Sequence, residues 1–284
     1  MILQLLLEGK MIKQYTLYLI LILSPLFTGC QSNALGRNAL TIMPSSMLNS
    51  QAEQAYADEK QKNKIIKNTR QSHLVQQVAN RLIMVANRDY ANYCQGFNWE
   101  VVLFDKPKVK NAYCMPGGKI AIYSGILPVC QNEAALAAVM GHEISHALLR
   151  HGNERVSQQI GLTTLMVGAN YALNKNENVS SVQKRNILIA VGLGSEFGVA
   201  LPFSRMHERE ADYLGLRLMA KAGYIPSEAP ALWKRMQANG KSMPEFLSTH
   251  PSDASRIKDL ESKQQEAFSL YRLAPHKYGK GENF

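Results

Sequence analysis

The sequence predicts an α+β fold that is mostly α-helical, with a small β-sheet beside one central helix. The first observation is the run 132–150, in which strong helix formers surround apolar residues at helical spacing. The second is a pair of short runs, 97–104 and 119–124, whose β-branched and aromatic residues are typical of strands. The third is a set of further segments with the apolar period of amphipathic helices: 73–87, 204–218, 227–236 and 253–272.

Residues 1–29 have the plan of a cleaved leader peptide. Lys13 precedes the short apolar run 15–23, and small residues follow it before Cys30. The sequence Thr28-Gly29-Cys30 resembles the lipobox of bacterial lipoproteins, whose cysteine becomes lipidated after cleavage. We therefore expect acyl chains on Cys30 that hold the protein to a membrane surface in the cell envelope, at the outer membrane facing the periplasm. The alternative is plain secretion with an unmodified cysteine.

Residues 30–70 are expected to link the lipid to the folded part of the chain. Residues 31–50 read as a tether, and residues 51–70 carry many lysines and few apolar positions, which predicts an exposed basic helix. That helix either lies on the membrane face or is simply solvated. The formal charge of +10 favours anionic lipid head groups or acidic partners. We expect no nucleic-acid partner, because an exported protein does not meet one.

The other cysteines are Cys94, Cys114 and Cys130. In an oxidising compartment two of the three could pair, which would leave one free, and the sequence does not choose which.

The central helix carries His142-Glu143-Ile144-Ser145-His146, an H-E-x-x-H pattern. Residues four apart lie one above the other on a single helix face, so the two imidazoles can meet one Zn²⁺ at about 2.0–2.1 Å. Glu143 lies between them and is placed to take a proton from a water on that metal. The alternative is a buried helix with two hydrogen-bonded histidines.

A zinc hydrolase needs three protein ligands and one open position. On chemistry alone Glu208 and Glu210 both qualify as the third ligand. Asp212 lies one turn after Glu208 and suits a hydrogen-bond acceptor for the free N–H of a ligand histidine, unless it faces solvent. We expect His207 to be structural or exposed, and His151 to be a cap or a packing residue.

At this point the chain resembles peptidase family M48, the HtpX/BepA-like zinc metalloproteases, over roughly residues 73–260. The resemblance rests on four motifs: Asn111-Ala112 with Pro116-Gly117-Gly118, His142-Glu143-x-x-His146, Ser204-Arg205-x-x-Glu208-x-x-Ala211-Asp212, and Thr249-His250-Pro251 with Arg256-Ile257. It implies a zincin-type metallopeptidase fold, one Zn²⁺ per chain held by His142, His146 and Glu208 rather than Glu210, Glu143 as the base, and Asp212 as the family's Ala-Asp aspartate.

Two further site predictions follow. In zincins the strand before the metal helix commonly edges the cleft and pairs with an extended peptide, which places Lys119, Ile120, Ala121, Ile122 and Tyr123 at the substrate. The alternative is an ordinary interior strand. His250 either lies by the cleft, where it stabilises an oxyanion or caps the zinc in a resting form, or belongs to a structural His-Pro turn with Arg256 pairing nearby carboxylates.

The resemblance implies an envelope metalloendopeptidase that cleaves misfolded or stalled periplasmic and outer-membrane proteins. A different function, a chaperone-like lipoprotein that holds unfolded outer-membrane proteins, stays open, as does the oligomeric state. We expect the peptidase domain over 71–262, with a helix end and loose tail over 263–284. After residue 151 we expect two helices, the second at 187–202, which frame the cleft and are joined by a loop that can act as a lid.

Overall fold

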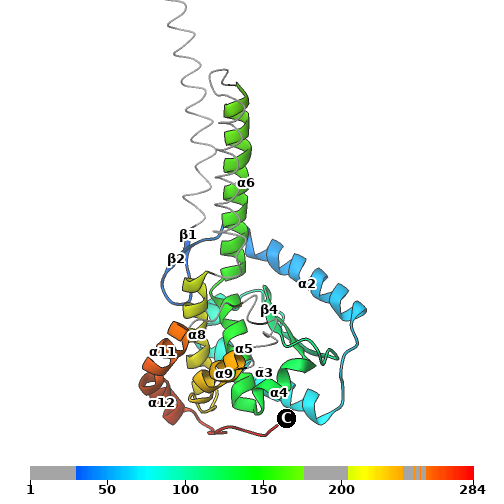
Figure 1. The fold of residues 1–284 in the computed structure, drawn as a ribbon, viewed down its shortest axis with the longest axis vertical. Helices are drawn as coiled ribbons and strands as arrows, with labels where there is room; N and C mark the ends of the chain where they lie inside the picture. The colour runs from blue at the N-terminus through cyan, green and yellow to red at the C-terminus, as the bar shows by residue number, and fades with distance from the viewer. Residues whose placement is uncertain (1–29, 176–203, 239–245, 247–249, 251–253) are drawn as a thin grey trace, which may run out of the picture.

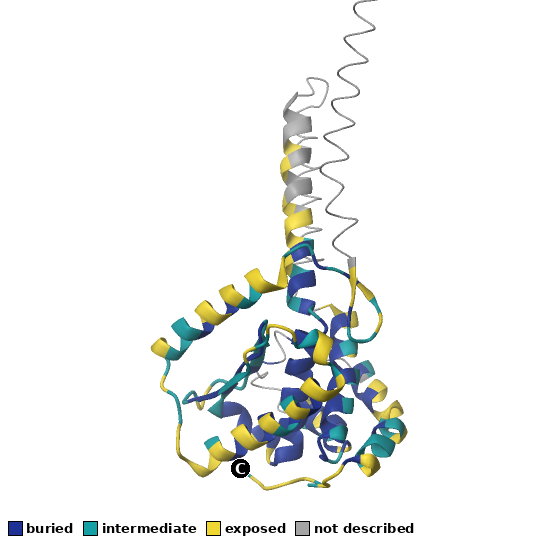
Figure 2. Ribbon diagram, turned by 180° about the vertical axis from the view of Figure 1, so that it is seen from behind, coloured by how far each residue is buried: buried dark blue, intermediate teal, exposed yellow. Residues whose placement is uncertain are grey.

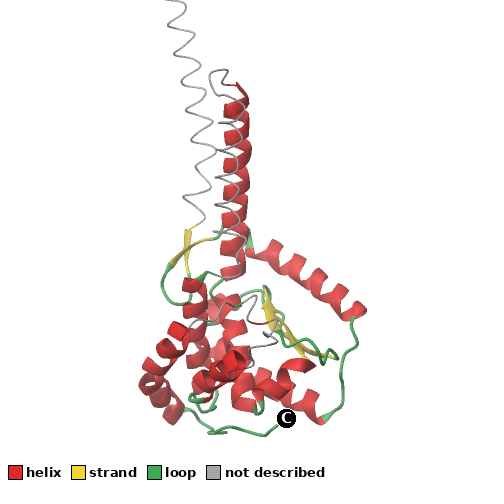
Figure 3. Cartoon of the chain, in the orientation of Figure 1, coloured by secondary structure: helices red, strands yellow, loops and turns green. Residues whose placement is uncertain are grey.

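The computed structural model describes residues 30–175, 204–238, 246, 250 and 254–284. It confirms an α+β fold that is mostly helical with small sheets (Figures 1 and 3). The strands are β1 Cys30–Ser32, β2 Asn38–Leu40, β3 Glu100–Phe104, β4 Ala112–Met115 and β5 Lys119–Tyr123. The helices are α2 Ser45–Lys62, α3 Arg70–Asp89, α4 Leu127–Cys130, α5 Glu133–Leu148, α6 His151–Lys175, α8 Arg205–Lys221, α9 Glu228–Ala238, α11 Ala254–Ser262 and α12 Gln264–Leu273. The apolar stretch 187–202 lies outside the described residues.

Helix α5 forms the centre of the core. Every residue from Glu133 to Leu148 is buried (Figure 2). The helix is buried on all sides, as expected for one that other elements surround, and α3, α8, α9 and β4 pack against it. Its first turn is capped by Asn132, whose Oδ1 accepts a hydrogen bond of 2.9 Å from the amide of Ala135.

Helices α5 and α8 cross at two glycines. A Cβ atom on Gly215 would lie 2.7 Å from the backbone nitrogen of His142, and one on Gly141 would lie 2.9 Å from the carbonyl oxygen of Gly215. No larger residue fits at this separation, so the glycine pair brings the backbones together. This crossing sets the distance between the histidines on α5 and the acidic residues on α8.

The prediction that residues 119–123 form an edge strand is wrong, because these residues are β5, which lies in the middle of its sheet. The strand order is β3-β5-β4, with β5 parallel to β3 and antiparallel to β4. Gly117 and Gly118, both at φ near +80°, form the tight turn that folds β5 back along β4. Residues Lys119 to Ile122 are buried, as in an interior strand. Strand β4 lies at the edge of this sheet and packs against α5.

The tether predicted for residues 31–50 is instead folded structure. Strands β1 and β2 form an antiparallel hairpin, and we call residues 30–43 the N-terminal hairpin. Asn153 Nδ2 donates to Met43 O at 2.8 Å, and the amide of Ile42 donates to Ser157 Oγ at 2.8 Å, so this segment is bonded to α6. Buried polar groups of the domain need these partners, which a free tether would not supply. Lipidation of Cys30 stays a prediction.

Helix α2 occupies part of the region predicted as a basic exposed helix. It is mostly exposed and buries only Ala52 and Tyr56 along its length. The hydroxyl of Tyr56 donates to the carbonyl oxygen of Ile120 at 2.6 Å, which attaches α2 to the central strand. Within the described residues, no helix is both long and apolar enough to cross a bilayer.

The C-terminal tail is bound to the domain, and not loose as predicted. The amides of Glu133 and Ala134 donate to the carbonyl oxygens of Glu282 and Lys280, each at 2.9 Å. These amides belong to the first turn of α5, where no intrahelical acceptor is available and burial excludes water. The helix predicted over 253–272 is two helices, α11 and α12, on either side of Lys263. Cys94, Cys114 and Cys130 are free thiols.

Candidate metal centre

Three predicted ligands meet between α5 and α8. His142 Nε2 and His146 Nε2 are 3.0 Å apart. The Glu208 carboxylate lies 3.3 Å from His142 Nε2 through Oε2 and 3.4 Å from His146 Nε2 through Oε1. Ligand atoms of a tetrahedral zinc, at bonds of about 2.0–2.1 Å, are about 3.3 Å apart. The three side chains therefore fit one Zn²⁺, and all three are buried.

His250 joins this cluster from the far side. Its Nδ1 is 3.0 Å from Glu208 Oε1 and 3.3 Å from His142 Nε2, and its Nε2 is 3.4 Å from Glu143 Oε1. One ligand atom from each of His142, His146, Glu208 and His250 lies within 4.8 Å of all the others. His250 therefore lies at the cluster, as one of the two sequence predictions has it. Its position suits a fourth ligand or a group that faces Glu143.

Electrostatics at the cluster favour a cation. Burial alone would raise the pKa of Glu208, but His142, His146 and His250 hold it well below its usual range. Burial would lower the pKa of His142, yet the carboxylates of Glu208 and Asp212 outweigh it and raise that pKa to about 9. Burial lowers the pKa of His146 well below its usual range. The carboxylates of Glu208 and Asp212 thus stabilise positive charge at this buried cluster, whose imidazole nitrogens and Glu208 oxygens are ligand types that Zn²⁺ takes.

Glu143 lies beside the cluster without acting as a ligand. Its Oε1 is buried and has no hydrogen-bond partner among the described residues. Burial raises the pKa of Glu143, against the opposing effect of His250 and His142. A backbone hydrogen bond from Cys114 places the carboxylate next to the edge strand β4. This is the position that a general base needs, close to the metal and close to an extended chain.

Asp212 and Arg256 support the cluster on one side. The Asp212 Oδ1 accepts from His142 Nδ1 at 2.9 Å, as the sequence predicted for this aspartate. Arg256 donates to both Asp212 oxygens at 2.7 Å, places Nη1 2.8 Å from Glu208 Oε2, and lies 4.0 Å above the Trp233 ring. Burial would raise the pKa of Asp212, but Arg256 and His142 together hold it below its usual value. Arg256 thus pairs with nearby carboxylates, as the second prediction for this segment states. His250 contacts the cluster as well, so the two predictions do not exclude each other.

Sequence reasoning missed the role of His151. It was expected to be a cap or packing residue, yet it is fully buried with its Nδ1 2.9 Å from His146 Nδ1. The competing ligand Glu210 lies outside the cluster, with its Oε2 2.9 Å from His151 Nε2. His207 is buried and stacks on His151, with ring centroids 4.3 Å apart. The only signal in the sequence is His151 five residues after His146, a spacing that does not place two side chains on one helix face.

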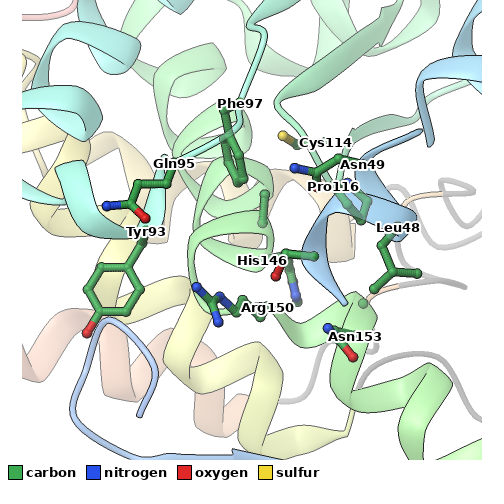
Figure 4. Close-up of a pocket in the computed structure, with 13 residues that line it drawn as sticks. Leu48, Asn49, Tyr93, Gln95, Phe97, Cys114, Pro116, His146, Arg150 and Asn153 are labelled. Atoms are coloured by element: carbon green, nitrogen blue, oxygen red, sulfur yellow. The ribbon is translucent and has the colours of Figure 1, made fainter. Parts of the chain in front are cut away.

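A pocket of about 140 Å³ adjoins the cluster at His146 (Figure 4). Residues from α2, β4, α5 and α6 meet there, which puts apolar and polar groups around one opening. Its main lining side chains are Leu48, Tyr93, Phe97, Pro116, Asn49, Arg150 and Asn153. A pocket beside both a metal ligand and the edge strand is suited to hold a side chain of an extended peptide.

Comparison with known proteins agrees with this geometry. The sequence profile described as peptidase family M48 matches residues 69–264. The chain is 36% identical over 197 residues to the mitochondrial metalloendopeptidase OMA1 of Schizosaccharomyces pombe, a match that covers 68% of this chain and 53% of that protein. It is 34% identical over 189 residues to the Saccharomyces cerevisiae protein of the same name, covering 62% and 50%.

A bacterial relative lies further away. The chain is 29% identical over 160 residues to the beta-barrel assembly-enhancing protease of Escherichia coli, a match that covers 55% of this chain and 32% of that protein. The matches thus span about half or less of these curated relatives. The profile match covers most of the chain, and its fold and its metal cluster are those that the family's zinc chemistry requires. The chain therefore belongs to peptidase family M48, a family of zinc metallopeptidases.

Proposed function

We propose that this chain is a zinc-dependent metalloendopeptidase whose metal is held by His142, His146 and Glu208. The observation that carries the proposal is the set of ligand-atom distances, 3.0, 3.3 and 3.4 Å, with a buried unliganded carboxylate beside them. When bound, Zn²⁺ supplies Lewis-acid activation of a water and of a peptide carbonyl. Each other step belongs to side chains or backbone of this chain.

Glu143 is the proton carrier in this proposal. Its carboxylate takes a proton from the attacking water and gives it to the leaving amine. The raised pKa of Glu143 suits this role, because a carboxylate with a higher pKa takes up a proton more readily, and a pKa nearer to the operating pH still lets it pass that proton on. Residues that hold Glu143 in place are the Cys114 backbone on β4 and the α5 helix itself.

Strand β4 is the proposed binding edge for the substrate. Within the described residues it pairs on one side only, with β5, so its other backbone edge is available for an extended polypeptide. Main-chain hydrogen bonds of this kind accept chains of almost any sequence, which suits unfolded or misassembled proteins as substrates. A side chain next to the scissile bond would enter the pocket lined by Leu48, Phe97 and Pro116. His250 is proposed as a further group at the metal.

We propose a bacterial envelope location, with the protein held to the membrane surface through acyl chains on Cys30. Support comes from the lipobox-like sequence and from the similarity to the beta-barrel assembly-enhancing protease of Escherichia coli. Removal of misfolded or stalled envelope proteins is the role that fits this location. The relatives from Schizosaccharomyces pombe and Saccharomyces cerevisiae are named as mitochondrial, so they support the proposed activity and not this location.

The test compares wild type with Glu143→Gln in the digestion of unfolded casein. We expect wild type to cleave, a zinc chelator to stop cleavage, and Glu143→Gln to bind one zinc while losing about 10²–10⁴-fold in rate. The matched control is Glu266→Gln, which removes a surface carboxylate paired with Arg217 and should leave cleavage unchanged. Suppressed aggregation of an unfolded outer-membrane protein by both wild type and Glu143→Gln, without cleavage by either, would instead favour a holding chaperone.

A further inference from the structure

The ligand His146 is backed by a chain of buried hydrogen bonds. His146 Nδ1 lies 2.9 Å from His151 Nδ1, and His151 Nε2 lies 2.9 Å from Glu210 Oε2. His151 has no exposed surface, and the Glu210 side chain is 15% exposed. The three groups come from α5, α6 and α8, so tertiary packing alone brings them together.

The direction of these bonds selects one form of His146. The Glu210 carboxylate accepts only, so His151 Nε2 must carry the proton that it donates. A neutral His151 then has a lone pair on Nδ1 and accepts from His146 Nδ1–H. This leaves His146 with its lone pair on Nε2, the atom that lies 3.0 Å from His142 Nε2 in the metal cluster. The hydrogen-bond chain thus favours the tautomer that binds a metal.

The N-terminal hairpin supplies the far end of the chain. Arg37 donates to Glu210 through Nε at 2.6 Å and through Nη2 at 3.0 Å. It also donates to both oxygens of Glu154, at 3.0 and 2.7 Å. The loop that carries Arg37 is shaped by Asn33, whose Oδ1 accepts from the amides of Leu35 and Arg37 at 3.0 Å each. Arg37 therefore fixes the Glu210 carboxylate against His151.

The two ligand histidines have the same kind of support. His142 donates to Asp212, which Arg256 holds with two hydrogen bonds. His146 donates to His151, which donates to Glu210, which Arg37 holds with two hydrogen bonds. We infer that His151, Glu210 and Arg37 are positioning residues for His146, so that the N-terminal hairpin is part of the metal site. The inference rests on the proposed zinc site.

The physical effect is on metal affinity. A hydrogen-bond acceptor behind a ligand histidine fixes its tautomer and ring orientation and raises its basicity, and losing one typically costs about 10–100-fold in metal affinity. His207 and Glu154 also face this chain: His207 stacks on His151, and its Nε2 is 3.0 Å from Glu154 Oε2. His207 thus packs on the His151 ring, and Glu154 pairs with both His207 and Arg37.

The test is a competition titration of zinc against a chromophoric chelator, on the purified full chain. His151→Leu removes the acceptor, and we expect the zinc dissociation constant to rise about 10–100-fold. His151→Asn keeps an acceptor oxygen at the position of Nδ1 and should recover most of the affinity. Glu210→Gln and Arg37→Ala should each weaken binding about tenfold, and Glu266→Gln, which breaks a surface Arg-Glu pair elsewhere, should not change it.

A double variant separates positioning from simple stabilisation. If Glu210 acts through His151, Glu210→Gln adds no further loss of zinc affinity in the His151→Leu background. Thermal unfolding of the metal-free variants shows which of them are folded. If His151→Leu is not folded, the milder change Glu210→Gln tests the same hydrogen-bond chain. Unchanged zinc affinity in folded Glu210→Gln and His151→Leu would overturn the inference. A loss from Glu210→Gln that adds in full to the loss from His151→Leu would overturn it too, because Glu210 would then not act through His151. A wild-type protein that binds no zinc would instead refute the proposed function.

Discussion

The glycine crossing of α5 and α8 makes a sharp prediction for Gly215→Ala. The new Cβ would lie 2.7 Å from the His142 nitrogen and 2.8 Å from the Gly141 carbonyl carbon, both rigid backbone atoms. Reaching an ordinary contact of 3.4 Å requires the helices to separate by about 0.7 Å. Overpacking of this kind costs about 1–3 kcal/mol, and the better helix propensity of alanine returns about 0.8–1 kcal/mol. We expect a net loss of up to about 2 kcal/mol in the free energy of unfolding.

The same separation moves Glu208, two turns earlier on α8, away from the histidine pair. Functional groups must be held within about 0.5 Å of their productive geometry, so zinc affinity should fall by about tenfold or more. The assays are thermal unfolding of the metal-free protein and zinc competition with a chelator. The matched control is Gly161→Ala on α6, where a Cβ meets nothing within 4 Å and helix propensity alone should stabilise the protein. A Gly215→Ala protein as stable as wild type, with the same zinc affinity, would refute this reasoning.

Four further predictions follow from the same structure. Asp212→Asn should weaken zinc binding about 10–100-fold in chelator competition, because His142 Nδ1–H loses its anionic acceptor; an unchanged affinity would count against the role of Asp212. Burial would raise the pKa values of Glu154 and Glu210, but pairing with His207, His151 and Arg37 lowers both to about 2 in the folded protein. Both values lie below those of the unfolded chain, so the unfolded state takes up more protons and stability falls with pH from about 4.5 towards 2. Urea unfolding of the metal-free protein across that range should show a shallower fall for Arg37→Ala. Truncation after Lys277 removes the carbonyl partners of the Glu133 and Ala134 amides in the first turn of α5. Each amide left without a partner should cost about 1–3 kcal/mol in the free energy of unfolding, which a lower midpoint of thermal unfolding would show. Cys30→Ser should move the expressed protein from the membrane fraction to the soluble fraction, and equal membrane association of both proteins would exclude acylation there as the anchor.

Local spacing explains what could be predicted of the metal site. Two histidines four residues apart must share a helix face, and Asp212 must share one with Glu208, whatever the rest of the chain does. The choice of Glu208 over Glu210 came from the resemblance to a family motif, and the structure agrees, since Glu210 faces His151 and Arg37 instead. Strands β3 and β5 and helices α3, α5, α8 and α9 are predictable for the same reason, because apolar period and turn residues act over a few residues.

The sequence by itself determined the helix that carries the histidine pair, the third acid and its partner aspartate, and the mostly helical α+β class. Only the tertiary structure decided that β5 lies between β3 and β4, that the tail covers the first turn of α5, and that Arg37 reaches Glu210 across 173 residues of chain. Periodicity shows which face of an element is apolar, but strand order and hydrogen-bond partners depend on which elements share that face. The support behind His146 comes from two other helices and a hairpin, and no local pattern in any one of them contains it.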